Sequence, residues 1–214
     1  MSRKWNPLFE ARKAKKSRPL ALLSSRGSGS VQALPEARNH TRREIGRFVP
    51  TSLLKNVKQE KSELGGLGLF AEQDVRQGEA VLEFGGVLER RRKGHDRYAM
   101  RIGNRLFLSN SHGVDNYINH SCEPACFIDF DRLQLVAMRD VKAGEELTFH
   151  YCTSEYKISP EFQFECRCGS ENCVKVVKGF FHLSEKEKQR LAPVLSPFLH
   201  DRLKTTHRKR RGSR

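Results

Sequence analysis

This chain of 214 residues has little of the material from which a large hydrophobic core is built. Only 37% of its residues are hydrophobic, so we expect one domain with extensions, and part of the length is expected not to pack. No apolar run approaches the roughly 20 residues that cross a bilayer, which excludes a membrane-spanning protein. We recognise neither a secretory signal nor an internal repeat.

Acidic residues are scarce at both ends of the chain. Residues 1–58 hold 14 Lys and Arg against 3 Asp and Glu, and residues 202–214 hold 7 basic residues and no acidic one. Because the whole chain has a formal net charge of +15, its middle is mildly acidic. An acidic body suits a cationic substrate such as a lysine-rich segment, whereas basic tails suit polyanions such as nucleic acid.

The basic tails have three interpretations that the sequence leaves open. The tails are solvated and disordered, or they contact nucleic-acid phosphates, or they are targeting signals. Residues 12–18 and 207–211 are typical of nuclear localisation patches, although an Arg- and Ser-rich, acid-poor N-terminus also fits an organellar transit peptide. We expect the nucleus, with the cytoplasm or an organelle as the alternative, and no membrane partner.

The apolar pattern divides the chain. Residues 1–52 show no lasting apolar period and are predicted to be a basic, disordered extension. From Leu53 on, short apolar runs alternate with turn residues, which predicts a mainly β domain. The predicted strands are Leu67–Ala71, Ala80–Phe84, Tyr98–Ile102, Arg105–Leu108, Cys126–Phe130, Leu133–Met138 and Glu146–Tyr151.

Helix signals follow the last cysteine. Ser184, three residues before Glu187, is typical of a capping box, and it predicts a helix that ends near Pro193. Ser196-Pro197 predicts the start of a second short helix. We therefore expect helices within residues 181–201, packed on the β domain, and a basic tail over residues 202–214.

Cysteine spacing indicates a metal site. Cys166, Cys168 and Cys173 form C-x-C-x4-C, which supplies three thiolates where a structural zinc site needs four ligands. Six cysteines in an intracellular-looking chain favour metal binding or free thiols over disulfides. The fourth ligand must come from elsewhere, and the cysteines near the other motifs are Cys122, Cys126 and Cys152.

Two further segments suit ligand binding. In Gly66-Leu67-Gly68 the missing side chains let a ligand approach the backbone, but the G-x-G-x-x-G form and a following helix are lacking, so a dinucleotide fold is not indicated. Asn119 offers donors and an acceptor beside a backbone that can read an adenine edge. Ser121 and His120 diverge on a strand, so a hydrolase site is not indicated.

Four segments, in this order, resemble the SET domain of protein-lysine methyltransferases. They are Gly66–Ala71 (GLGLFA), Asn119–Cys122 (NHSC), Glu146–Tyr151 (ELTFHY) and Cys166–Cys173 (CRCGSENC). The resemblance implies a SET domain over residues 53–156 and a post-SET zinc-binding segment over 157–180. It also implies a mainly β (α+β) fold, the SET-type β-clip of short curved sheets, in which the NHSC segment and the strand near Tyr151 form a threaded, pseudoknot-like arrangement.

The resemblance also implies ligands. S-adenosylmethionine is expected to be bound by Gly66, Leu67, Gly68, Asn119, His120 and Tyr151. Structural zinc is expected to be held by Cys122 together with Cys166, Cys168 and Cys173, with Cys126 or Cys152 as the alternative to Cys122.

Methyl transfer from a sulfonium to a lysine amine needs a neutral amine in line with the methyl group, in a dry channel. A nearby sulfonium lowers the pKa of that lysine. We expect Tyr151 to orient the amine rather than act as a strong base, because its own unperturbed pKa is about 10. By resemblance Phe149 occupies the Phe/Tyr switch, which implies di- or trimethylation, and Tyr98 is the second channel tyrosine.

The chain departs from the family pattern at three positions: Asn116 replaces the usual Arg, Ala125 the usual Asn, and His150 the frequent Asp. The predicted function is an S-adenosylmethionine-dependent protein-lysine N-methyltransferase that acts on a histone lysine in chromatin. The alternatives are a methyltransferase of a non-histone protein, such as a ribosomal protein, and a non-catalytic zinc-containing module that binds chromatin.

Overall fold

The computed structural model describes residues 45–90 and 98–211, with the backbone alone for residues 206–211. The described residues belong to one unit of the chain, residues 36–214. The predictions for residues 1–44, including the basic patch at 12–18, and for residues 91–97 and 212–214 lie outside the described residues, as do the side chains of the basic patch at 207–211.

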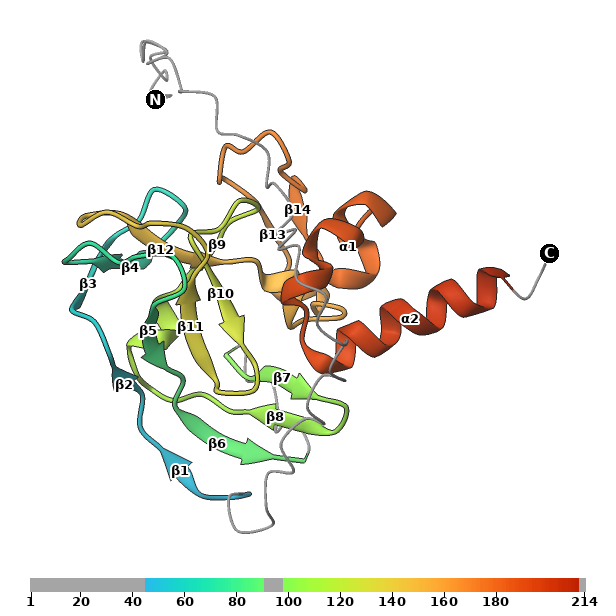
Figure 1. The fold of residues 1–214 in the computed structure, drawn as a ribbon, viewed down its shortest axis with the longest axis horizontal. Helices are drawn as coiled ribbons and strands as arrows, with labels where there is room; N and C mark the ends of the chain where they lie inside the picture. The colour runs from blue at the N-terminus through green and yellow to red at the C-terminus, as the bar shows by residue number, and fades with distance from the viewer. Residues whose placement is uncertain (1–44, 91–97, 212–214) are drawn as a thin grey trace, which may run out of the picture. The chain divides into compact units, whose positions relative to one another are not determined.

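Short strands dominate the described residues, as the sequence predicts (Figure 1). The strands are β1 (Phe48–Val49), β2 (Ser52–Leu53), β3 (Val57–Lys61), β4 (Leu67–Ala71), β5 (Ala80–Glu83), β6 (Gly86–Glu89), β7 (Met100–Gly103), β8 (Leu106–Leu108), β9 (Asn119–His120), β10 (Cys126–Asp129), β11 (Gln134–Ala137), β12 (Glu146–Phe149), β13 (Phe164–Glu165) and β14 (Val176–Val177). The helical elements are η1 (Val114–Tyr117), η2 (Tyr151–Thr153), η3 (Pro160–Phe162), η4 (Phe180–His182), α1 (Glu185–Leu191), η5 (Ala192–Val194) and α2 (Pro197–Arg211).

The strands are short because turn residues interrupt them. Gly78 and Gly144 both have positive φ, 84° and 85°, which glycine adopts without strain, and each comes just before a strand of the core. Within β6 and β10 the side chains alternate between buried and half-buried, as expected for strands with one face on a core. The mainly β fold class of the prediction is confirmed.

The strands form small sheets that place the sequence motifs side by side. The sheets have the strand orders β1-β6-β8-β7, β10-β11-β5-β2, β3-β4-β12-β9 and β13-β14. In the third sheet β12 pairs antiparallel with β4 and parallel with β9. Thr148 lies opposite Asn119 and Phe149 opposite His120, so the predicted meeting of the NHSC segment with the strand before Tyr151 is observed.

Two hydrophobic clusters stabilise the fold. The larger one lies among the sheets, with Leu69, Leu82, Leu135 and Leu147 fully buried. The second joins the segment after β12 to the helices; its members include Cys152, Val177, Phe180, Leu191, Phe198, Leu199 and Leu203. The C-terminal helices therefore pack on the rest of the domain, as predicted, and α2 contacts β7.

Both predicted helix starts are observed, but the second helix is longer than predicted. The side chain of Ser184 accepts a hydrogen bond from the backbone N–H of Glu187, and Pro197 is the first residue of α2. α2 continues to Arg211, through residues that were assigned to a basic tail. Leu203, one turn after Leu199, is buried in the second cluster and draws the helix past residue 201.

The other differences are strands that the sequence did not predict, β3 and β6 among them, and shifts at element ends. β1 and β2 begin before Leu53, since Phe48 pairs with Val87 and Ser52 with Glu83, although their side chains are exposed and give no apolar period. The strand predicted to reach Tyr151 ends at Phe149, because His150 accepts a hydrogen bond from the backbone N–H of Cys152 and caps η2.

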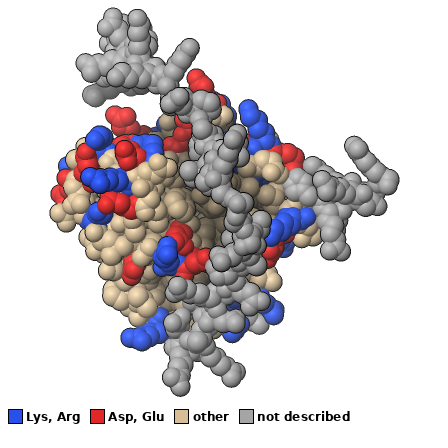
Figure 2. All heavy atoms as spheres, in the orientation of Figure 1, with Lys and Arg blue, Asp and Glu red and all other residues tan. Residues whose placement is uncertain are grey.

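Charged side chains of both signs share the surface. On the face drawn in Figure 2 they are interspersed where β3 and β4 lie. Ion pairs on the described surface include Lys58 with Glu60 at 2.8 Å and Lys142 with Asp74 at 2.7 Å. Among the helices of the described residues, none has the length and apolar character needed to cross a bilayer.

Candidate functional site

The first three motifs meet around the side chain of Asn119. From β9 its Nδ2 donates to the backbone oxygen of Leu67 at 3.1 Å and to Oε1 of Glu146 at 2.7 Å. Leu67 begins β4 and Glu146 begins β12, so two hydrogen bonds join all three strands at one point. The predicted cofactor residues Leu67, Gly68 and Asn119 are therefore brought together.

Two of the glycines before and in β4 have different roles. Gly66 has φ +64°, and nothing lies within 4 Å of where its Cβ would be. A glycine is therefore favoured at this position by its backbone conformation and not by lack of space. A Cβ on Gly68 would lie 2.3 Å from Oε1 of Glu146 and 3.0 Å from Cβ of Ser62. Gly68 therefore makes room for a carboxylate of its own chain, a role that the sequence analysis assigned to an approaching ligand.

Tyr151 is fixed at both its backbone and its hydroxyl. Its N–H donates to Nδ1 of His120 at 3.1 Å, and its hydroxyl donates to the backbone oxygen of Ile118 at 2.9 Å. Its ring centroid lies 4.9 Å from that of Phe149 and 5.3 Å from that of His120. The structure thus brings Tyr151, Phe149 and His120 together, as expected.

Phe164 completes this aromatic group and was missed by the sequence analysis. Its ring lies 5.9 Å from that of Tyr151 and 6.0 Å from that of His120, although it belongs to β13 and is 38% exposed. The available signal was an aromatic residue two positions before Cys166, the first cysteine of the triple run.

Tyr98 lies at the edge of the described region. It directly follows the undescribed residues 91–97, precedes β7 and is 42% exposed. Its role in the site stays a prediction.

The four expected zinc ligands form one group. The Sγ atoms of Cys122, Cys166, Cys168 and Cys173 all lie within 4.8 Å of one another, and those of Cys122 and Cys166 are 3.8 Å apart. Tetrahedral zinc with Zn–S bonds of about 2.3 Å separates two sulfurs by about 3.8 Å, so the cluster fits the ion. Cys126 and Cys152 are buried and are not members of this group.

Hydrogen bonds and burial give the thiols different acidities. Burial raises the pKa of Cys122 well above its usual range and that of Cys166 to about 11. Burial also acts on Cys168, but hydrogen bonds with Ser170, Cys122 and Cys166 together outweigh it and lower the pKa of Cys168 to about 6. A thiolate therefore forms at Cys168 before it forms at Cys122 or Cys166, and a cation at the centre of the group is what would deprotonate those two thiols.

His120 links this cluster to Tyr151. Its Nδ1 accepts from the backbone N–H of Tyr151, so in the neutral ring the hydrogen is on Nε2, which donates to Sγ of Cys122 at 3.4 Å. The backbone N–H of Val174 donates to the same sulfur at 3.4 Å. N–H donors of this kind stabilise a metal-bound thiolate.

His150 is buried beside His120 and is not arranged as a metal ligand. Its Nδ1 accepts from the backbone N–H of Cys152 at 3.3 Å, so the hydrogen of the neutral ring is on Nε2. That Nε2 has no hydrogen-bond partner among the described residues. His120, Cys122 and His150 lie within metal-ligand distance of one another, but both Nε2 atoms carry hydrogens where lone pairs would be needed. Burial lowers the pKa of His120 to about 4 and that of His150 to about 2.

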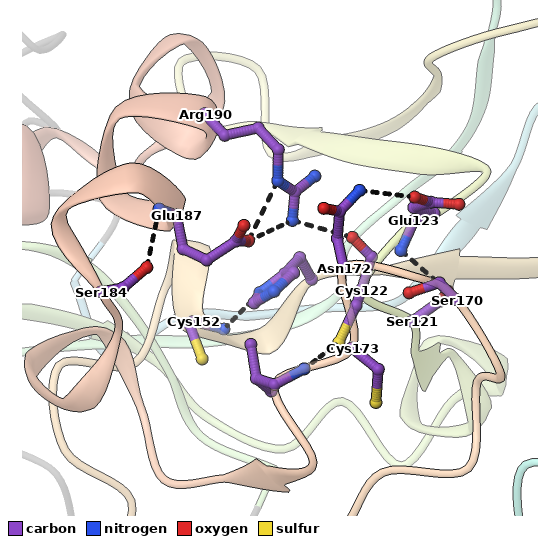
Figure 3. Close-up of polar contacts among 12 residues, drawn as sticks. Ser121, Cys122, Glu123, Cys152, Ser170, Asn172, Cys173, Ser184, Glu187 and Arg190 are labelled. Atoms are coloured by element: carbon purple, nitrogen blue, oxygen red, sulfur yellow. Dashed lines mark hydrogen bonds and ion pairs between the residues drawn. The ribbon is translucent and has the colours of Figure 1, made fainter. Parts of the chain in front are cut away.

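Helix α1 fastens the NHSC segment from outside (Figure 3). The guanidinium of Arg190 donates to the backbone oxygen of Cys122 at 2.9 Å and pairs with Glu187 at 2.7 Å. The side chain of Asn172, within the triple-cysteine run, donates to Glu123 at 2.8 Å. Both contacts, absent from the sequence analysis, hold elements distant in sequence against the cysteine cluster.

Comparison with protein families matches residues 66–152 to the family described as "SET domain". Among similar curated proteins, the histone-lysine N-methyltransferase, H3 lysine-36 specific, of Candida albicans is 33% identical over 58% of this chain and 17% of its own length. The protein of that name from Aspergillus oryzae is 32% identical over 56% of this chain and 14% of its length. This chain therefore matches less than a fifth of either relative.

Solved structures include the methyltransferase domain of human histone-lysine N-methyltransferase SETMAR, which is 20% identical with a TM-score of 0.49 over 59% of each chain. KRYPTONITE in complex with mCHG DNA and SAH is 25% identical with a TM-score of 0.48, over 58% of this chain and 29% of the other. The family match lies on the strands that carry the three motifs, from Gly66 to Cys152. The matched segment, residues 66–152, is therefore similar to a SET domain.

Proposed function

We propose that this chain is an S-adenosylmethionine-dependent protein-lysine N-methyltransferase that acts on histone H3. The observation that carries the proposal is Tyr151, whose hydroxyl is fixed within an aromatic group beside the NHSC segment of a SET domain. The curated relatives are named as H3 lysine-36 methyltransferases, which supports a histone substrate.

The hydrogen bond of Tyr151 suits the orientation of an amine. Because the hydroxyl hydrogen is donated to the backbone oxygen of Ile118, the phenol oxygen faces an incoming amine as an acceptor. A neutral lysine amine can donate one N–H to that oxygen and direct its lone pair toward the methyl group. The rings of Phe149, His120 and Phe164 limit access of water to the reacting atoms.

S-adenosylmethionine supplies the sulfonium methyl group when it is bound. We place its binding at Gly66, Leu67, Gly68, Asn119 and His120, with Tyr151 facing the methyl group. The convergence of Leu67 and Asn119 on one point supports this placement. The positive charge of the bound sulfonium favours the neutral form of the target lysine.

The residues of the channel bear on how many methyl groups are added. Phe149 has no hydroxyl to hold water or restrict the amine, which supports di- or trimethylation. Tyr98 is proposed as the tyrosine that faces the target lysine from the side of β7.

Cys122, Cys166, Cys168 and Cys173 are proposed to hold a structural zinc ion. Through Cys166 this ion would keep β13, and with it Phe164, against Tyr151. Four thiolates form a closed site, so the ion's contribution is to order the segment and not to take part in the reaction.

We further propose that the protein acts in the nucleus, and that the basic residues near its ends contact nucleic-acid phosphates. The mildly acidic middle of the chain supports a basic protein substrate. The high density of Lys and Arg in residues 202–214 supports the phosphate contacts.

The experiment is transfer of labelled methyl from S-adenosylmethionine to core histones and to a whole-cell protein extract. We expect label on H3 that is lost with Tyr151→Phe and kept with Tyr156→Phe, a control in the second hydrophobic cluster. Label on another protein would assign a non-histone substrate. No label with a folded, zinc-loaded protein would favour a non-catalytic module.

A further inference from the structure

The side chain of Asn119 is held in one orientation by its surroundings. Both hydrogens of its amide nitrogen are used, one for the backbone oxygen of Leu67 and one for Oε1 of Glu146. The reverse orientation would direct Oδ1 at these two oxygens. It is unfavourable because all three oxygens are acceptors. Oδ1 is therefore the atom that Asn119 presents to a ligand, and it can only accept.

The carboxylate of Glu146 is itself held from two sides. Its Oε2 accepts from the hydroxyl of Ser62 at 2.8 Å, and that hydroxyl in turn accepts from the backbone N–H of Leu64 at 2.9 Å. On its other side lies Gly68, where a Cβ would collide with Oε1. Ser62 is buried and Glu146 half-buried, so the carboxylate has a defined position.

We infer that Glu146 is a positioning residue for binding of the methyl donor: it holds Asn119 so that Oδ1 accepts from an N–H group of the bound S-adenosylmethionine. This inference rests on the proposed function and adds a residue to it. A freely rotating Asn119 would present its NH2 group about as often as its oxygen, and a donor facing a donor binds poorly. Glu146 acts through Asn119 and needs no contact with the ligand.

The test is a double-mutant cycle on the binding of S-adenosylhomocysteine (SAH), measured by calorimetry on the full chain. Glu146→Ala and Asn119→Ala are each expected to raise the Kd by about tenfold, the effect of one lost hydrogen bond. The double variant is expected to bind no more weakly than Asn119→Ala alone, because Glu146 has nothing left to position.

A conservative variant separates position from charge. In Glu146→Gln the side-chain oxygen can still accept from Asn119 while its NH2 turns to Ser62, so the Kd is expected within about threefold of the native value. With labelled methyl transfer as a second readout, Glu146→Ala is expected to raise KM for the methyl donor and leave kcat unchanged. Glu145→Gln is the matched control, because Glu145 pairs with Arg139 and not with Asn119.

The results that overturn the inference are distinct. Native affinity in Glu146→Ala, additive losses in the double variant, or a Gln variant as weak as the Ala variant would each refute positioning through Asn119. If Glu146→Ala does not fold, Ser62→Ala takes its place, with a loss of about threefold that disappears in the Asn119→Ala background. A native chain that binds SAH without transferring methyl refutes the proposed function alone; one that binds neither SAH nor the methyl donor refutes both.

Discussion

Gly68 and Glu146 are in contact across β4 and β12, and the carboxylate of Glu146 occupies the place of the side chain that Gly68 lacks. This pair connects a glycine of β4 with the strand that leads to Tyr151. The contact explains why a glycine is needed at residue 68 although its backbone has no positive φ.

The first prediction contrasts the two glycines. Gly68→Ala displaces Glu146 from Asn119 and is expected to raise the Kd for SAH by about tenfold. Gly66→Ala forces a side chain into the left-handed region, so it is expected to lower the free energy of unfolding by about 1–2 kcal/mol with a smaller effect on affinity. Calorimetry and denaturant unfolding of both variants check this, and equal losses of affinity would contradict it.

The second prediction concerns the cysteine cluster. Cys122→Ser and Cys173→Ser are expected to lower the zinc content of the purified protein well below one ion per chain, because a closed site needs all four ligands. Cys126→Ser, at a buried cysteine outside the cluster, is expected to keep one ion. Elemental analysis gives the content, and zinc lost only from Cys126→Ser would contradict the assignment.

Removal of zinc gives a related prediction for stability. A strong chelator is expected to lower the Tm of the native chain and to leave that of Cys122→Ser unchanged, because binding to the folded state alone stabilises it. An equal decrease in both proteins would show that the chelator acts elsewhere.

His150 predicts a dependence of stability on pH. Burial first, and then the charges of His120 and Arg190, lower the pKa of His150 from 6.5 to about 2 in the folded state. Below pH 6.5 the unfolded chain therefore binds a proton that the folded chain does not. As the pH decreases below 6.5, the free energy of unfolding is therefore expected to decrease, by up to about 1.4 kcal/mol per pH unit for this group.

The matched variant is His150→Asn, which keeps an acceptor for the N–H of Cys152 and does not titrate. Between pH 6 and 4 its free energy of unfolding is expected to change less steeply than that of the native chain, by up to about 1.4 kcal/mol per pH unit, the slope of one proton. Identical slopes would place the titration at another group.

A further prediction concerns the product. The ring centroid of Phe149 lies 4.9 Å from that of Tyr151. Phe149→Tyr is expected to shift methylation toward the monomethyl form, because the added hydroxyl is a hydrogen-bond partner for water or the amine. Mass spectrometry of the modified peptide gives the distribution, and an unchanged distribution would contradict the role of Phe149.

The sequence predicted what local patterns encode. The strand Leu67–Ala71 was predicted with its observed bounds, and Ser184 with Glu187 predicted a helix start that is observed. The resemblance brought Asn119, His120 and Tyr151 into one site, and the structure places them together.

Long-range contacts were not predictable in this way. The bonds from Asn119 to Glu146 and from Arg190 to Cys122 join residues 27 and 68 positions apart, and neither pair has a local signature. β1 and β2 were missed because exposed side chains such as Phe48 and Leu53 leave no alternation to detect. The predicted second helix ended too early because a run of basic residues gives no sign that Leu203 is buried.

The most direct test of the central claim measures SAH affinity and methyl-transfer rate in the same preparations of the native chain and of Tyr151→Phe. We expect the variant to bind SAH with a Kd within about twofold of native and to transfer methyl to histone H3 about a hundredfold more slowly, because the amine is no longer oriented. Tyr151→Phe at the native rate, or a native chain that binds SAH and methylates no protein, would contradict it.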